Sequence, residues 1–248
     1  MLNWFLAIGF TAALAAAPQA ARAAELIILG SQGSITGVRD MAAAFEKASG
    51  HKVIARQEKD VMATVNAGTP ADIATLNPPL IDKLIKEGKV VGNRVDFARA
   101  GIGVAVKAGA PKPDLSTTEA FVRMLRNAKS IGYSQAGSGL MVANIIKALG
   151  LTEELKARTK FLDGFPAAEA VARGEVEIAM QQINVILPVA GAELAGPLPS
   201  ELQQYNHFAV GVLAVSKERE AAAAMVKFMA APENAGVLRK GGLEPPAR

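Results

Sequence analysis

The chain has 248 residues, half of them apolar, and its 27 basic and 23 acidic residues give a formal net charge of +4. The basic residues are scattered, whereas nucleic-acid binding needs a dense stripe of Lys and Arg, so nucleic acid is excluded as a partner. The absence of cysteine excludes disulfides, a thiolate nucleophile, Cys-ligated metals and a lipid anchor on cysteine.

The first predicted element is a signal peptide over residues 1–23. Residues 4–17 carry no charge, and small residues surround a cleavage site at Ala21-Arg22-Ala23. The apolar run is about 14 residues long, whereas a membrane-spanning helix needs roughly 20. We therefore expect export to the periplasm as an untethered protein. A retained membrane anchor is the alternative.

After residue 23, short apolar runs typical of strands alternate with amphipathic patterns typical of helices. In the first part, strands are predicted over residues 26–29, 51–57 and 71–76, and helices over 35–48, 60–67 and 79–87. In the middle, a strand over 100–106 precedes helices over 116–127, 138–149, 155–161 and 167–173 and strands over 129–134 and 176–180. A loop over 191–204, a strand over 207–215 and helices over 216–230 and 232–240 complete the chain.

Two details mark helix starts. Ser116 and Glu119 have the spacing of a capping box, and Ser216 is expected to cap the helix that follows it.

The alternation predicts an α/β fold of two lobes, each with a mostly parallel sheet flanked by helices. The apolar strands over 100–106 and 207–215 are expected to cross between the lobes. Lobe 1 would comprise residues 24–105 and 208–248, and lobe 2 residues 106–207. The alternative is one continuous doubly wound sheet.

Two Gly/Ser loops lead from a strand into a helix, over residues 30–34 and 134–139. Such a loop directs free backbone N–H groups and the positive helix end at one point, which suits an anion. Each loop alone is explained by turn and cap formation. One loop in each lobe favours a shared anion-binding cleft. Arg56 and Lys59 are the expected cations near the first loop, and Gln181, Gln182 and Asn184 either line the cleft or hydrate a loop.

Some residues match part of an enzyme motif. Gly132-Tyr133-Ser134 begins a nucleophile elbow, and Asp163 and His207 follow in the chain order of a hydrolase triad, but the last glycine of the motif is missing. Nucleotide-binding glycine motifs are absent, and the two histidines, His51 and His207, lack metal-site spacing. We expect no enzyme, cofactor or metal, with a serine hydrolase of Ser134, Asp163 and His207 as the alternative.

Three stretches, residues 24–53, 67–77 and 135–150, together resemble the molybdate-binding group of periplasmic solute-binding proteins. The resemblance spans nearly the whole chain after the signal peptide. It implies the type II periplasmic binding protein fold, in which two α/β lobes close on a ligand and deliver it to an ABC permease of the inner membrane. We expect a monomer that binds a small anionic solute.

The resemblance also implies positions for the binding residues. Gly33 stands where the group has its first loop serine, Lys59 or its neighbour Glu58 where it has the second, and Gln182 where it has a tyrosine. The backbone donors fall at Ser138 and about Gly164. The resulting ligand-binding set is Ser31, Gly33, Ser34, Lys59, Ser138, Gly139, Gly164 and Gln182.

The departures at Lys59 and Gln182 bear on the ligand. A compact tetrahedral oxyanion needs short neutral donors on every side, whereas a lysine and a long amide suit an organic di- or tricarboxylate. We expect such a carboxylate, with molybdate or tungstate as the alternative.

Overall fold

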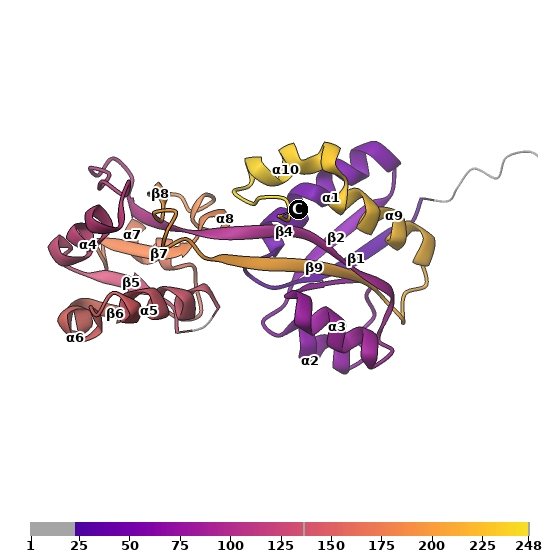
Figure 1. Cartoon of the computed structure of the whole chain (residues 1–248). Coiled ribbons are helices and arrows are strands. Elements are labelled where there is room, and N and C mark those ends of the chain that lie inside the picture. Colours follow the sequence, from indigo (N-terminus) through magenta and orange to yellow (C-terminus); the bar gives the residue numbers. More distant parts are fainter. Residues whose placement is uncertain (1–22, 136, 248) are drawn as a thin grey trace, which may run out of the picture.

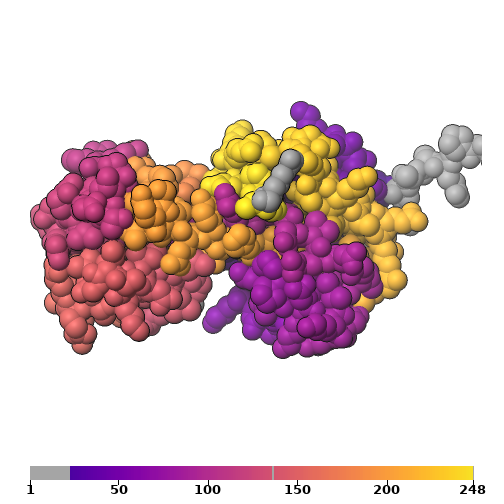
Figure 2. Space-filling view, in the orientation of Figure 1, coloured from indigo at the N-terminus to yellow at the C-terminus, as the bar shows by residue number. Residues whose placement is uncertain are grey.

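The computed structural model describes residues 23–135 and 137–247, so the predicted signal peptide lies outside the described residues. Figure 1 shows two lobes side by side, and Figure 2 shows the narrower waist between them. Strands β4 (Val90–Lys107) and β9 (Tyr205–Leu213) run from one lobe into the other. The predicted fold class, two α/β lobes joined by two crossing strands, is confirmed.

Lobe 1 is built on the strand order β2-β1-β3-β9-β4, in which the first three strands are parallel and the last two antiparallel. Its other strands are β1 (Glu25–Gly30), β2 (Lys52–Gln57) and β3 (Ile73–Leu76). Its helices are α1 (Ile35–Ser49), α2 (Val61–Asn66), α3 (Pro78–Lys86), α9 (Arg219–Ala230) and α10 (Ala235–Lys240), with a 3-10 turn over Pro232–Asn234.

The apolar run of β1 reflects helices on both faces of this sheet. Leu26 and Ile28 pack in the core under α1 and α9, while Leu29 packs in a second core with α2 and α3. Figure 1 shows the two groups of helices on opposite faces. A strand covered on both sides has no polar face, as the sequence predicted.

Lobe 2 continues the sheet through β4-β7-β5-β6, with β8 paired to β4. Strands β5, β6 and β7 are parallel to one another, and β4 is antiparallel to β7 and β8. These strands are β5 (Ile131–Tyr133), β6 (Thr159–Phe161), β7 (Ile178–Gln182) and β8 (Ala192–Pro197). The helices are α4 (Thr118–Asn127), α5 (Ser138–Ala148), α6 (Thr152–Leu155), α7 (Ala167–Ala172) and α8 (Ile183–Ile186), with a 3-10 turn over Lys156–Arg158.

Strand β4 belongs to both lobes and changes its pairing partner at a defined point. Residues up to Gly101 pair with β9, and residues from Ile102 onward pair with β7. The pairing with β9 begins at Tyr205, which lies opposite Gly101. The strand therefore changes sheets a few residues before the boundary expected after residue 105.

Several local predictions were wrong. Residues 159–161, expected within a helix, form β6 beside β5, and residues 192–197, expected in a loop, form β8. In both cases pairing with a distant strand outweighs local preference. The strand over 100–106 begins at Val90, because β9 pairs with its earlier half.

Both predicted caps were also wrong. Thr117, rather than Ser116, caps α4 by accepting a hydrogen bond from the N–H of Ala120 at 3.1 Å. Ser116 donates instead to Asp114. Ser216 donates to the buried Asp72 at 2.6 Å, and α9 begins only at Arg219. No helix among the described residues combines the length and apolarity needed to cross a membrane.

Candidate functional site

A cleft of about 330 Å³ lies between the lobes, where both Gly/Ser loops end. Its polar lining consists of loop and strand-end residues from both sides: Ser31, Gln32, Lys59, Asn77, Ser134, Ser138, Asp163, Gln181, Gln182 and Asn206. Its apolar lining consists of Leu162, Phe165, Val185 and Phe208. The volume falls in the range of small-molecule sites.

The first loop connects β1 to α1 and turns tightly on itself. The N–H groups of Ser34 and Ile35 both donate to the carbonyl of Ser31, at 3.0 and 2.9 Å. Ser31 and Gly33 line the cleft. Ser34 does not, because its fully buried hydroxyl lies 3.0 Å from that of Thr75 and also donates to the Ser31 carbonyl. The side chain of Ser34 thus braces the loop from within, and its role in ligand binding stays a prediction.

The second loop connects β5 to α5. Gly137 has a φ of +55° and lacks a capping side chain, so α5 begins at Ser138 with its first N–H groups available to a ligand. Ser138 lines the cleft. Gly139 is not part of that lining, and a Cβ at this position would lie 1.7 Å from the carbonyl oxygen of Ser134. Gly139 therefore permits close packing of the loop on the helix.

A third loop, between β6 and α7, adds Asp163 and Gly164 to the cleft. The Oδ1 atom of Asp163 accepts a hydrogen bond from the N–H of Gln135 at 2.9 Å, which ties this loop to the second one. Gly164 has a φ of +89°, a conformation that glycine adopts without strain.

Three buried amides are the least satisfied groups of the cleft. Gln181 and Gln182, at the end of β7, and Asn206, near the start of β9, are each over nine-tenths buried. Within the described chain, the Oε1 atoms of both glutamines and the Nδ2 atom of Asn206 have no hydrogen-bond partner. Such groups cost free energy when buried, and a polar ligand would supply their partners.

Of the expected cations, Lys59 and Arg56, only one lines the cleft, and the amide of Asn184 lies beside it. Lys59 lines the cleft from lobe 1, whereas Arg56 forms an ion pair with Glu58 at 2.7 Å. The Nδ2 atom of Asn184 donates to the carbonyl of Gly33 and to the hydroxyl of Thr36, both at 2.9 Å. Asn184 thus bridges the two lobes beside the cleft.

The predicted hydrolase triad does not assemble. Ser134 and Asp163 line the cleft, but His207 is exposed and is not part of the lining. Its neighbours on β9, Asn206 and Phe208, point into the cleft, and side chains alternate between the two faces of a strand. A serine nucleophile here would lack its histidine base.

The charge of the cleft is balanced. Among its described lining residues, Lys59 and Asp163 are the two with acidic or basic side chains. Burial raises the pKa of Tyr133, which precedes Ser134, so this phenol stays neutral and adds no charge nearby. Over residues 23–135 and 137–247, no cluster of three or more His, Cys, Asp or Glu side chains is suited to hold a metal.

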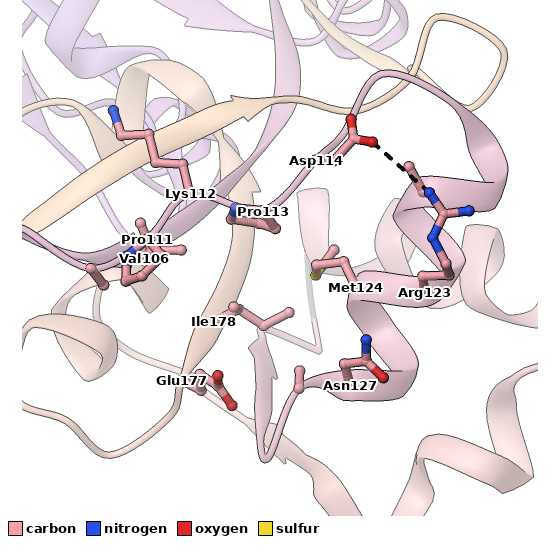
Figure 3. A pocket seen from close by; sticks show the side chains of 13 residues that line it. Val106, Pro111, Lys112, Pro113, Asp114, Arg123, Met124, Asn127, Glu177 and Ile178 are labelled. Carbon is pink, nitrogen blue, oxygen red and sulfur yellow. Dashed lines mark ion pairs between the residues drawn. The ribbon is translucent and has the colours of Figure 1, made fainter.

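A second hollow, of about 440 Å³, lies within lobe 2 (Figure 3). Apolar side chains such as Met124 and Ile178 form part of its wall, and Asp114 pairs with Arg123 at 3.9 Å on its rim. Both loops and all three unsatisfied cleft amides lie outside its lining. The cleft between the lobes is therefore the candidate site.

The sequence reasoning missed Asn77 and Asn206 as lining residues. Asn77 directly precedes the prolines that open α3, a position at a strand end comparable to that of the two loops. Asn206 carries no motif of its own and lies next to His207, the residue that matches the order of a hydrolase triad. Strand alternation would have placed either His207 or its two neighbours in the cleft, with nothing local to choose between them.

A family model for "bacterial extracellular solute-binding protein" matches residues 26–244. The aconitate isomerase of Pseudomonas sp. is 30% identical over 97% of this chain and 94% of its own. The molybdate-binding protein ModA of Azotobacter vinelandii is 27% identical over 90% of this chain and 91% of its own. The solved structure of the A. vinelandii periplasmic molybdate-binding protein shares the fold, with a TM-score of 0.72 and 20% identity over 90% of this chain and 100% of that one.

These comparisons confirm the resemblance to molybdate-binding proteins and correct one expectation. We expected a protein that is not an enzyme, and a relative over almost the full chain is an isomerase. The expectation is therefore wrong. It rested on the absence of familiar catalytic motifs, which says little about a reaction that needs only a well-placed proton acceptor.

Proposed function

Because the chain belongs to the family of bacterial extracellular solute-binding proteins, we propose that its cleft binds an unsaturated tricarboxylate such as aconitate and isomerises it. The observation that carries this proposal is the 30% identity to an aconitate isomerase over 97% of the chain. The donors of the cleft give it chemical support.

Aconitate carries three carboxylates on a three-carbon skeleton, and the cleft offers donors from several directions. Lys59 supplies a cation from lobe 1, and the start of α5 supplies backbone N–H groups from lobe 2. The amides of Gln181, Gln182 and Asn206 lie between them at the strand ends. A spread of long donors suits an extended anion better than a compact tetrahedral one.

The reaction requires little of the protein. Removing a proton from the methylene carbon of aconitate leaves an allyl carbanion that extends onto the carboxylates. Returning the proton to the former vinylic carbon restores the same connectivity, with either geometry at the new double bond. The protein must bind the carboxylates, stabilise the developing charge with fixed donors, and move one proton.

Proton NMR tests this proposal directly. The protein is incubated with cis-aconitate in D₂O, and we expect signals of the trans isomer together with deuterium at the exchangeable carbon positions. Thermal shift with aconitate, citrate, sulfate, molybdate and tungstate is measured in parallel. No isomerisation, combined with selective stabilisation by molybdate or tungstate, would overturn the proposal in favour of oxyanion binding.

The family also supports a second role, capture of the same anion in the periplasm for an ABC permease. Hinged closure of the two lobes about β4 and β9 would present the loaded form to that permease. Reconstituted with the permease of its own host, the protein should stimulate ATP hydrolysis only when the anion is present. Stimulation without anion, or none with it, would argue against this role.

A further inference from the structure

One carboxylate side chain, that of Asp163, lines the cleft in the part of the chain that the structure describes. The ammonium group of Lys59 has no lone pair to accept a proton, and the hydroxyl of Ser134 would need a base of its own to become one. The amides of the cleft are neutral and weakly basic. Asp163 is therefore the group best able to remove a proton from a bound ligand.

The setting of Asp163 fits that task. Its Oδ1 atom accepts a hydrogen bond from the backbone N–H of Gln135 at 2.9 Å, which orients the carboxylate. The side chain is exposed to the cleft, and no described residue donates to its Oδ2 atom. One oxygen is thus held, the other has no donor among the described residues, and the next residue, Gly164, leaves room beside it.

Building on the proposed isomerase function, we propose that Asp163 is the catalytic residue that transfers the proton. Its carboxylate takes a proton from the methylene carbon of the tricarboxylate, and the electron pair of the broken C–H bond delocalises over the allyl system. The protonated Asp163 then gives a proton to the former vinylic carbon, and the double bond reforms one position along. Asp163 ends as a carboxylate, and no other reactant is consumed.

In this scheme one lobe supplies the cation that binds the substrate, and the other supplies the base. Lys59, on the loop between β2 and α2, attracts a carboxylate of the substrate from lobe 1, while Asp163 approaches from lobe 2. The cation and the N–H groups at the start of α5 offset the repulsion between an anionic base and an anionic substrate. Lobe closure brings both groups to the same ligand.

Asp163→Asn is the decisive variant. The amide oxygen can still accept the hydrogen bond from Gln135, but the amide cannot take a proton. We expect isomerisation to fall by roughly 100-fold or more, while aconitate still raises the melting temperature of the variant. Asp82→Asn, which removes the charge of a half-buried aspartate that pairs with Arg94 in lobe 1 outside the cleft, serves as the control and should isomerise at the wild-type rate.

A second variant guards against misfolding and tests the chemistry. Asp163→Ala leaves a gap that a small carboxylate fills, so added formate should restore part of the isomerisation rate. A residue with a merely structural role would show no such rescue. Isomerisation by Asp163→Asn within threefold of wild type, or no rescue of a folded Asp163→Ala that still binds aconitate, would overturn the inference. A wild-type protein that binds aconitate without isomerising it would instead overturn the proposed function on which the inference rests.

Discussion

The two walls of the cleft are built from similar strand-to-helix loops, yet their polar side chains are satisfied in different ways. On the lobe 1 side, the hydroxyl of Ser34 is fully buried and bonded to Thr75 and to its own loop. On the lobe 2 side, Gln181 and Gln182 are almost as buried, and their carbonyl oxygens have no partner within the described chain.

One wall is therefore fixed by internal hydrogen bonds, whereas the other holds unsatisfied amides. The lobe 1 loop is held in shape by its own hydrogen bonds and presents a fixed surface. The end of β7 holds two amides whose oxygens have no partner within the described chain, at a cost to the stability of the free protein. Removing the side-chain polar groups of Ser34 and of Gln182 should therefore affect folding and binding in opposite proportions.

The largest effect is expected from Gly139→Ala. Its Cβ would lie 1.7 Å from the backbone oxygen of Ser134, so either the loop or α5 must move. We expect a loss of about 3 kcal/mol or more in the free energy of unfolding, measured by urea denaturation followed by circular dichroism. Gly236→Ala is the matched control, because a Cβ there meets nothing within 4 Å, and it should leave stability unchanged or slightly higher. Equal midpoints for the two variants would contradict this packing.

Ser34→Ala should have an intermediate effect on the lobe 1 wall. The variant loses the hydroxyl contacts with Thr75 and Ser31, and we expect destabilisation by about 1–2 kcal/mol in the same unfolding experiment. Ser200→Ala, an exposed serine, should stay within about 0.5 kcal/mol of wild type. A Ser34→Ala protein as stable as the control would show that lobe 1 does not depend on these bonds.

Gln182→Leu should have the smallest effect on the free protein. The substitution removes an acceptor that has no partner, so stability should change by less than about 0.5 kcal/mol while the thermal shift caused by aconitate is reduced. Gln203→Leu gives the contrast, because its amide exchanges two hydrogen bonds with the backbone of Ile102, at 2.8 and 2.9 Å. Gln203→Leu should lose stability and keep the response to aconitate. If Gln182→Leu lost stability and Gln203→Leu lost the response to aconitate, this contrast between the two amides would be wrong.

The helices and the parallel strands were accessible from the sequence because their signals are local. Helix α1 could be read from its apolar spacing and from Gly50, which ends it in a left-handed conformation with a φ of +76°. Strands β6 and β8 were not accessible. Each forms because a partner strand, β5 or β4, lies beside it, and that partner is remote in sequence.

The candidate site was predictable to the extent that it uses loops between strands and helices. Lys59, Ser138 and Gln182 were expected from the resemblance and lie on the cleft wall, where their role in binding stays a prediction. The sequence pattern marks Asp163 only as a member of a triad with His207. In the register of β9 with β4, His207 does not face the cleft, whereas Asp163 lines the cleft together with the amides.

The alternation of most strands and helices, the two Gly/Ser loops and the lack of cysteine can be read directly from the chain, because these depend on residue type and short-range spacing. Which side chains share one cleft depends instead on how remote segments pack together. Asn77, Asp163 and Asn206 come from three distant segments, and they meet where the chain passes between the lobes along β4 and into β9. Sequence spacing carries no record of such contacts, since packing and strand pairing between remote segments create them.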